Sequence, residues 1–138
     1  RQGRDHARTP MQWDASPQGG FTTATPWIMA NPNYARLNVA AQETDPGSIL
    51  NYYRRLIAFR KAHPALVYGH TRVLPQPETS VYAYLREGEG ERLLVVLNFA
   101  SEPYELVLPA GDWKQAIGNY PPRYPDRMQP WEARVYQG

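Results

Sequence analysis

The sequence predicts a mainly β protein whose C-terminal half is an antiparallel β-sandwich. Three observations lead to this prediction. Residues 67–138 contain six short runs with strand-like patterns, and Gly- and Pro-rich turn sequences separate them. One amphipathic helix, at residues 45–63, precedes these runs. Six strands in so short a stretch, with no helix between them, favour antiparallel pairing into two packed sheets.

The first element is an irregular segment, residues 1–44, with neither helical nor strand periodicity. Prolines recur along it at a spacing that leaves no room for a long helix. Ordered loops of this length are usually functional or packed on another part of a protein. We therefore expect its aromatic side chains to be covered by another scaffold or by self-association of the chain: Trp13, Phe21, Trp27 and Tyr34.

The second element is the helix at residues 45–63. Asp45 is a good N-cap and Pro46 suits the first helical position. Pro64 disfavours helical geometry at the residue before it, so the helix should end there. Apolar residues recur at three- and four-residue spacing and give the helix a stripe that needs a partner surface: Ile49, Tyr52, Tyr53, Leu56 and Phe59.

The six predicted strands follow in order as "HTRVL", "SVYAYLRE", "RLLVVLNFA", "YELVLP", "WKQAIGNY" and "EARVYQ". Residues 93–97 are apolar on both faces, which predicts a central strand. The runs "YELVL" and "WEARVY" alternate, which predicts one solvated face for each and places Glu105 and Glu132 there. The isolated arginines, Arg134 among them, are expected on the solvated surface.

Composition limits the function further. The chain has 138 residues, enough for one ordinary domain, and no apolar run of the length that a membrane helix needs. We expect a soluble chain with a cytoplasmic location. The net charge is +2, but the basic residues are scattered rather than gathered on one element, so the sequence does not indicate nucleic-acid binding. The first residue is Arg1 rather than Met, from which we expect a piece of a longer protein.

The candidate catalytic groups are few. Asp5 and Asp14 are the carboxylates with functional-looking neighbours, and two acids in an irregular loop are weak evidence for a glycosidase pair. The three histidines have no second ligand at metal-binding spacing, and the chain has no cysteine and no phosphate-binding glycine loop. The sequence therefore predicts no catalytic residue, no metal and no cofactor within this chain.

One motif is specific. The stretch "GRDHARTPMQWD" resembles the signature that follows the last barrel strand in the oligosaccharide-cleaving branch of glycoside hydrolase family 13, which includes oligo-1,6-glucosidases and α-glucosidases. The similarity continues through "GFTTATPWIMANPNYARLNV" and "DPGSILNYYRRLIAFRKAHPALVYG" to "LLVVLNF" and "PWEARVY". The resemblance implies that residues 1–66 are the last loop and helix of a (β/α)8 barrel and that residues 67–138 are the C-terminal β-sandwich domain.

The resemblance also implies which chemistry lies elsewhere. In this family the nucleophile, the acid and the stabilising carboxylate come from motifs upstream of this segment, the last with an Asn-His-Asp form that this chain lacks. The chain should then be the C-terminal portion of an α-glucosidase-type hydrolase acting on α-glucosidic oligosaccharides, inactive alone, with the missing barrel as its partner. By the same resemblance Arg4 and Asp5 bind substrate at the pocket mouth. Alternatively, Arg4, Asp5 and Arg8 form an ion-paired knot that holds the loop.

Two other functions are compatible with the same residues. A free-standing carbohydrate-binding module would use tryptophan rings as stacking platforms. A transporter accessory subunit is also similar in carrying an "RTPMQW"-like motif, on a membrane-anchored chain. The platforms of the first alternative would be Trp13, Trp27, Trp113 or Trp131.

Overall fold

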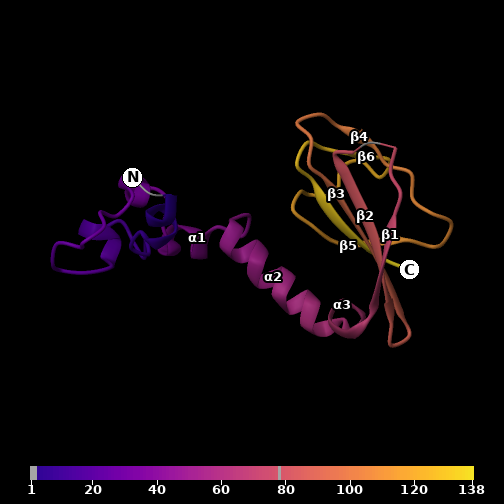
Figure 1. Cartoon of the computed structure of the whole chain (residues 1–138), viewed down its shortest axis with the longest axis horizontal. Coiled ribbons are helices and arrows are strands. Elements are labelled where there is room, and N and C mark those ends of the chain that lie inside the picture. The colour runs from indigo at the N-terminus through magenta and orange to yellow at the C-terminus, as the bar shows by residue number, and fades with distance from the viewer. Residues whose placement is uncertain (1–2, 78) are drawn as a thin grey trace. The chain divides into compact units, whose positions relative to one another are not determined.

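The structure is a computed structural model that describes residues 3–77 and 79–138, without the side chains of Arg4 and His6. Contacts divide the chain into two compact units, Arg1–Arg55 and Leu56–Gly138 (Figure 1). Among the described residues, no helix has the length and apolar character needed to cross a membrane.

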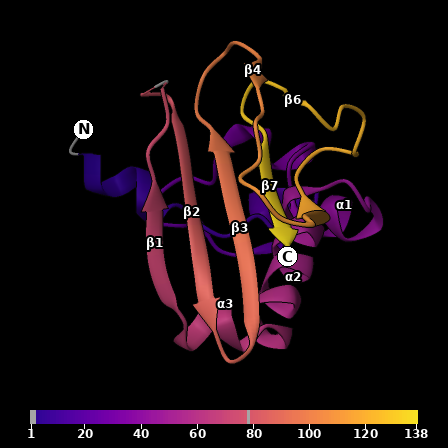
Figure 2. The ribbon, with the colours of Figure 1, turned by 90° about the vertical axis from the view of Figure 1, so that its right-hand side faces the viewer.

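The C-terminal unit contains two antiparallel sheets. The larger has the strand order β1-β2-β3-β7-β5, and Figure 2 shows β1, β2, β3 and β7 side by side. Its strands are β1 (His70–Leu74), β2 (Val81–Gly88), β3 (Glu91–Asn98), β7 (Ala133–Gln137) and β5 (Lys114–Gly118). The smaller sheet pairs β4 (Tyr104–Glu105) with β6 (Arg127–Met128).

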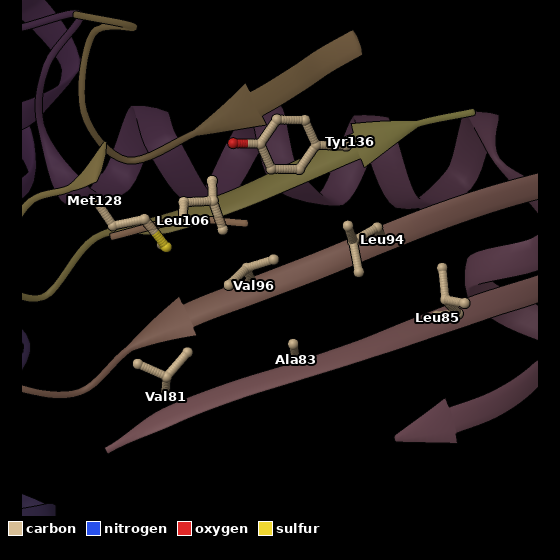
Figure 3. Packing of buried hydrophobic residues seen from close by; sticks show 8 residues of the cluster. All are labelled: Val81, Ala83, Leu85, Leu94, Val96, Leu106, Met128 and Tyr136. Atoms are coloured by element: carbon tan, nitrogen blue, oxygen red, sulfur yellow. The ribbon is translucent and has the colours of Figure 1, made fainter. Parts of the chain in front are cut away.

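The main core lies between these two sheets. Alternate residues of β2, β3 and β7 point inward from the large sheet, because successive side chains on a strand face opposite ways. Leu106 and Met128 close the core from the β4–β6 side (Figure 3). The buried members on the large sheet are Val81, Ala83, Leu85, Leu94, Val96 and Tyr136. The predicted mainly β architecture with an antiparallel sandwich is confirmed.

The other face of the large sheet carries a second core. Here Leu93, Val95 and Val135 pack against Ala65, which is fully buried in the short helix α3 (Pro64–Tyr68). Phe59, from the C-terminal part of α2 (Ile49–Ala62), also packs against this cluster. The expectation that one end of the predicted helix packs on the sandwich is therefore confirmed.

The prediction for the individual strands was right for β3 and wrong for β7. β3 lies between β2 and β7, as its apolar run indicated. β7 also lies between two strands, β3 and β5, and both faces of its middle are buried. Glu132 and Arg134 are consequently buried rather than solvated. Sequence patterning also missed β6, and β4 is shorter than its alternating run.

The predicted helix begins later than expected. Its first residue is Ile49, and the hydroxyl of Ser48 accepts a hydrogen bond from the Asn51 amide at 3.2 Å, which is a capping contact. The carboxylate of Asp45 instead accepts from the Gly47 amide at 2.8 Å and closes a turn. The predicted end is confirmed, because the helix stops two residues before Pro64.

A helix that the sequence analysis did not predict, α1 (Val39–Thr44), lies within the irregular segment. The side chain of Asn38 caps it by accepting from the Ala41 amide at 2.8 Å.

Candidate functional site

The motif "GRDHAR" forms a 3₁₀ helix, Gly3–Arg8, at the start of the N-terminal unit. Asp5 in this helix is half-buried and lines a hollow of about 300 Å³. Thr9 and Asn31 add a hydroxyl and an amide to its wall, and Trp27 adds an indole ring. The hollow thus combines hydrogen-bonding groups with an aromatic surface, which is the combination that a sugar ring requires.

Arg8 lies over the ring of Trp27, with its guanidinium carbon 5.6 Å from the ring centroid. This is a cation–π contact, and it leaves Trp27 81% exposed. Among the side chains that the structure describes, no ion pair joins Asp5 to Arg8. The side chain of Arg4, the other predicted substrate-binding residue, lies outside the described part.

Gln12 fastens the motif to the rest of the N-terminal unit. Its side-chain amide donates to the Asn33 side chain at 3.0 Å and to the Leu37 carbonyl. The main-chain carbonyl of Gln12 accepts from the Val39 amide at 2.9 Å, at the start of α1. These bonds join segments far apart in sequence, so the rim around Asp5 has a defined backbone although it contains no regular strand.

Asp14 has a structural role. The amide of Ser16 donates to its carboxylate at 2.8 Å, and the Ser16 hydroxyl donates to it as well. These two bonds, the hydroxyl first, lower the pKa of Asp14 because they stabilise the charged form. The turn that follows holds Gly19 and Gly20 at φ of +67° and +68°, a conformation that favours glycine. Both glycines are therefore turn residues.

His63 and Glu91 form a contact that their sequence positions did not indicate, because the two residues lie 28 positions apart. The His63 ring nitrogen Nδ1 lies 3.0 Å from one Glu91 oxygen, and the other oxygen accepts from the Ala65 amide at 3.2 Å. The carboxylate thereby anchors α3 to the start of β3. Within the described part of the chain, no group of three or more potential metal ligands occurs.

A buried charge network at β7 was also missed. Arg134 donates to Glu132 through Nε at 2.7 Å and through Nη2 at 3.0 Å, and each residue is 1% exposed. Arg134 also donates to the main-chain carbonyls of Tyr124 and Arg127 at 2.8 and 2.7 Å. Burial lowers the pKa of the Arg134 guanidinium, but its bonds to Glu132 and Tyr136 outweigh this and raise the pKa. The spacing of Glu132 and Arg134 could have indicated this pair, because residues two positions apart on a strand lie on the same face.

A hollow with a carboxylate and an exposed indole, in a chain that continues into an antiparallel sandwich, is typical of carbohydrate-active enzymes. The family comparison agrees with this class. The family model described as "Alpha amylase, catalytic domain" matches residues 1–69, and that described as "Maltogenic Amylase, C-terminal domain" matches residues 71–133. The chain belongs to the alpha-amylase family of glycoside hydrolases, also called family 13, and corresponds to its C-terminal segment.

Curated relatives resemble the chain along nearly all of its length. An oligo-1,6-glucosidase of Parageobacillus thermoglucosidasius is 42% identical and matches 98% of the chain, which covers 26% of that protein. An alpha-glucosidase of Pediococcus pentosaceus is 36% identical over 97% of the chain and 24% of that protein. The chain therefore spans about a quarter of the length of these relatives.

Solved structures agree with the fold. The trehalulose synthase from Pseudomonas mesoacidophila MX-45 superimposes with a TM-score of 0.90 at 42% identity, over 97% of the chain and 26% of the synthase. Since the matches are to enzymes and to a catalytic-domain model, a free-standing carbohydrate-binding module is not favoured.

Proposed function

We propose that the chain acts as the C-terminal part of an α-glucosidase-type hydrolase that cleaves α-glucosidic oligosaccharides. One observation supports this most strongly, namely the 42% identity with an oligo-1,6-glucosidase that extends over 98% of the chain. The catalytic carboxylates belong to the part of the longer protein that these 138 residues do not include, so the chain alone is inactive. A retaining site needs two carboxyl groups about 5 Å apart, and among the described residues that line the hollow Asp5 is the one carboxylate.

Within this function, residues 1–66 complete the catalytic barrel and residues 67–138 form the separate sandwich domain. The junction of the two family models, between residues 69 and 71, supports this division, as does the start of β1 at His70. The boundary drawn by contacts lies earlier, after Arg55, because Phe59 and Ala65 pack on the sheet. Contacts group residues by packing, whereas the family models group them by common descent. We therefore take the boundary between the family models as the domain boundary of the enzyme.

Arg4 and Asp5 bind the oligosaccharide at the rim of the pocket. The hollow beside Asp5 supports this role, because its carboxylate can accept hydrogen bonds from sugar hydroxyls while the ring of Trp27 offers an apolar face. The guanidinium of Arg4 supplies a fixed set of donors for the same hydroxyls.

The longer protein with Arg4→Ala tests the rim assignment. Loss of a charge-assisted hydrogen bond is typically worth about 1.5–3 kcal/mol, so kcat/KM on isomaltose should fall roughly ten- to a hundredfold. Arg4→Lys should recover part of this loss, because an ammonium lacks the planar fork. Arg8→Ala is the matched control and should alter stability through its contact with Trp27. A lower Tm with unchanged kcat/KM in Arg4→Ala would make Arg4 a structural residue.

The barrel is the intramolecular partner, and exposed aromatic rings of residues 1–44 drive self-association when the barrel is absent. The exposure of Trp13, Phe21 and Trp27 supports this. Sedimentation of the 138-residue chain with and without Trp27→Ser tests it, and a strictly monomeric chain at high concentration would contradict it.

We also propose a cytoplasmic location, which fractionation of expressing cells tests.

A further inference from the structure

A second hollow, of about 880 Å³, lies in the C-terminal unit. Residues that follow β1 and residues that follow β3 line it, and Figure 2 shows these two strands ending at the same end of the large sheet. We call it the end hollow and define it by Leu74, Gln76, Tyr104, Glu105 and Leu108. Its volume falls within the range of about 300–1,000 Å³ that is usual for small-molecule sites.

The floor and walls of the end hollow are largely apolar and rigid. Leu74, Tyr104 and Leu108 line it, and the same three side chains pack against the main core between the two sheets. Proline rings with a fixed backbone angle add to the wall: Pro75, Pro77, Pro103 and Pro109. A ligand that packs against such a wall orders few side chains, so little of its binding energy is lost to entropy.

Two polar side chains of the end hollow hold each other in place. The hydroxyl of Tyr104 donates to the side-chain oxygen of Gln76 at 3.0 Å. The side-chain nitrogen of Gln76 donates to the main-chain carbonyls of Pro75 and Leu74, at 2.9 and 3.4 Å. These bonds occupy the donors of the pair but leave lone pairs on both side-chain oxygens. The Tyr104 and Gln76 oxygens are therefore positioned to accept hydrogen bonds from a ligand.

Asn98, which is 2% exposed, fixes the wall that follows β3. Its side-chain nitrogen donates to the main-chain carbonyls of Glu102 and Gln129, both at 2.9 Å. Its side-chain oxygen accepts from the Ala100 amide at 3.0 Å. These bonds define the shape of the wall before any ligand binds, as is usual for small-molecule sites.

The charges of the end hollow limit the class of ligand. Glu102 and Glu105 are exposed members of the lining, and none of the described lining residues is Lys, Arg or His. Neither carboxylate takes part in an ion pair within the described part of the chain. Carboxylates disfavour an anion such as a phosphorylated sugar and favour a ligand rich in hydrogen-bond donors. Arg127 lies opposite Glu105 in the small sheet and offsets part of the negative charge, so a neutral ligand fits better than a cation.

We propose that the end hollow is a carbohydrate-binding site of the C-terminal unit, and that it holds glucosyl units of a neutral α-glucosidic oligosaccharide. Sugar hydroxyls donate to the oxygens of Gln76, Tyr104 and Glu105, while the C–H face of a ring packs on the apolar floor. The neutral, donor-rich ligand follows from the lining, whereas the α-glucosidic linkage rests on the proposed function. The hollow beside Asp5 belongs to the N-terminal unit, so each hollow can be altered by its own substitutions.

An NMR titration of the 138-residue chain with isomaltotriose tests the site, with the side-chain amide of Gln76 as the reporter. Glu105→Gln removes a charge and keeps the shape of the hollow, and Tyr104→Phe removes the hydroxyl and keeps the ring. Glu89→Gln is the matched control, because Glu89 lies in the turn between β2 and β3, at the other end of the large sheet. Unchanged circular dichroism checks that each variant folds.

Isomaltotriose should shift the Gln76 signal until the site is saturated. The Kd read from this signal should rise about three- to tenfold in Glu105→Gln and in Tyr104→Phe, the factor expected for one lost hydrogen bond. Glu89→Gln should change this Kd less than about twofold. Asp5→Asn should also change it less than about twofold, because Asp5 lines the other hollow.

The site would be overturned by the absence of a shift at Gln76, or by an equal Kd in all variants. A shift caused by spermidine and not by isomaltotriose would also overturn it, because the ligand would then be a cation. Glucose release by the longer protein separates this test from the proposed function. Binding at the end hollow of a longer protein that releases no glucose from isomaltotriose would refute the proposed function and leave the site intact, whereas release without binding would do the reverse.

Discussion

Replacing Arg134 by methionine removes the cation from the buried network at β7 and keeps a long apolar side chain in its place. The change leaves the Glu132 carboxylate buried, with the Gln129 amide at 2.6 Å as its remaining donor. The carbonyls of Tyr124 and Arg127 also lose their donor. Breaking a buried pair in this way costs about 3–5 kcal/mol, mainly because a charge stays buried without compensation.

This cost is large for so small a unit. Native domains are stable by about 5–15 kcal/mol, and in a unit of this size 1 kcal/mol shifts Tm by about 4–8 °C. We therefore expect Arg134→Met to lower Tm by at least about 12 °C, measured by circular dichroism of the sheet. The double variant Arg134→Met/Glu132→Leu should recover part of the loss, because it removes the buried charge as well.

The matched control is the exposed pair of Arg54 and Glu43, whose N–O distance is 2.8 Å. Both side chains are about half exposed, so Arg54→Met should cost at most about 1 kcal/mol. If Arg134→Met also cost less than about 1 kcal/mol, or if the double variant were less stable than Arg134→Met, the buried network would not have the role assigned to it.

Three further predictions concern single sites. The pKa of the Asp14 carboxyl should lie below the ordinary value of about 3.9, and Ser16→Ala should raise this pKa in an NMR titration. The contribution of the ionised carboxylate to folding stability is present above the ordinary pKa and is lost as the pH falls through the lowered pKa. Gly69→Ala should cost about 1–3 kcal/mol in denaturant unfolding, because a Cβ atom there would lie 2.5 Å from the Ala65 carbonyl oxygen. Gly3→Ala is the control, because a Cβ atom at Gly3 would meet nothing within 4 Å, and a loss in Gly69→Ala no larger than in this control would refute the clash. Glu91→Ala should lower the unfolding free energy by about 1–3 kcal/mol, because α3 loses its hydrogen bonds to the Glu91 carboxylate, and Glu91→Gln should lower it less. Equal unfolding free energies for Glu91→Ala and the unmodified chain would show that Glu91 does not anchor α3.

The spacing of apolar residues predicted the elements whose buried side chains follow the sequence pattern. Residues 93–97 have apolar side chains on both faces, and β3 lies at the centre of the sheet. The helix from Ile49 was found through its apolar spacing, although Asp45 was the wrong cap. Ser48 caps it instead, and sequence alone does not decide between two good capping residues three positions apart.

The errors arose where tertiary contacts outweigh local pattern. The run that contains Glu132 and Arg134 alternates like a strand with one solvated face, but the two charges neutralise each other inside the core. Met128 belongs to a two-residue strand, too short to leave a periodic signal. The hollow beside Asp5 is lined by Trp27 and Asn31, which lie more than twenty residues away in sequence. The motif therefore indicated a site at Asp5 but not the residues that line it.

Glucose release from isomaltose, measured side by side for the longer protein and for the 138-residue chain, tests the central claim most directly. We expect release by the longer protein and none by the chain, because in the proposed function the acid and the nucleophile come from outside these residues. Turnover by the chain that persists through purification and disappears in Asp5→Asn would show that the 138 residues are active on their own.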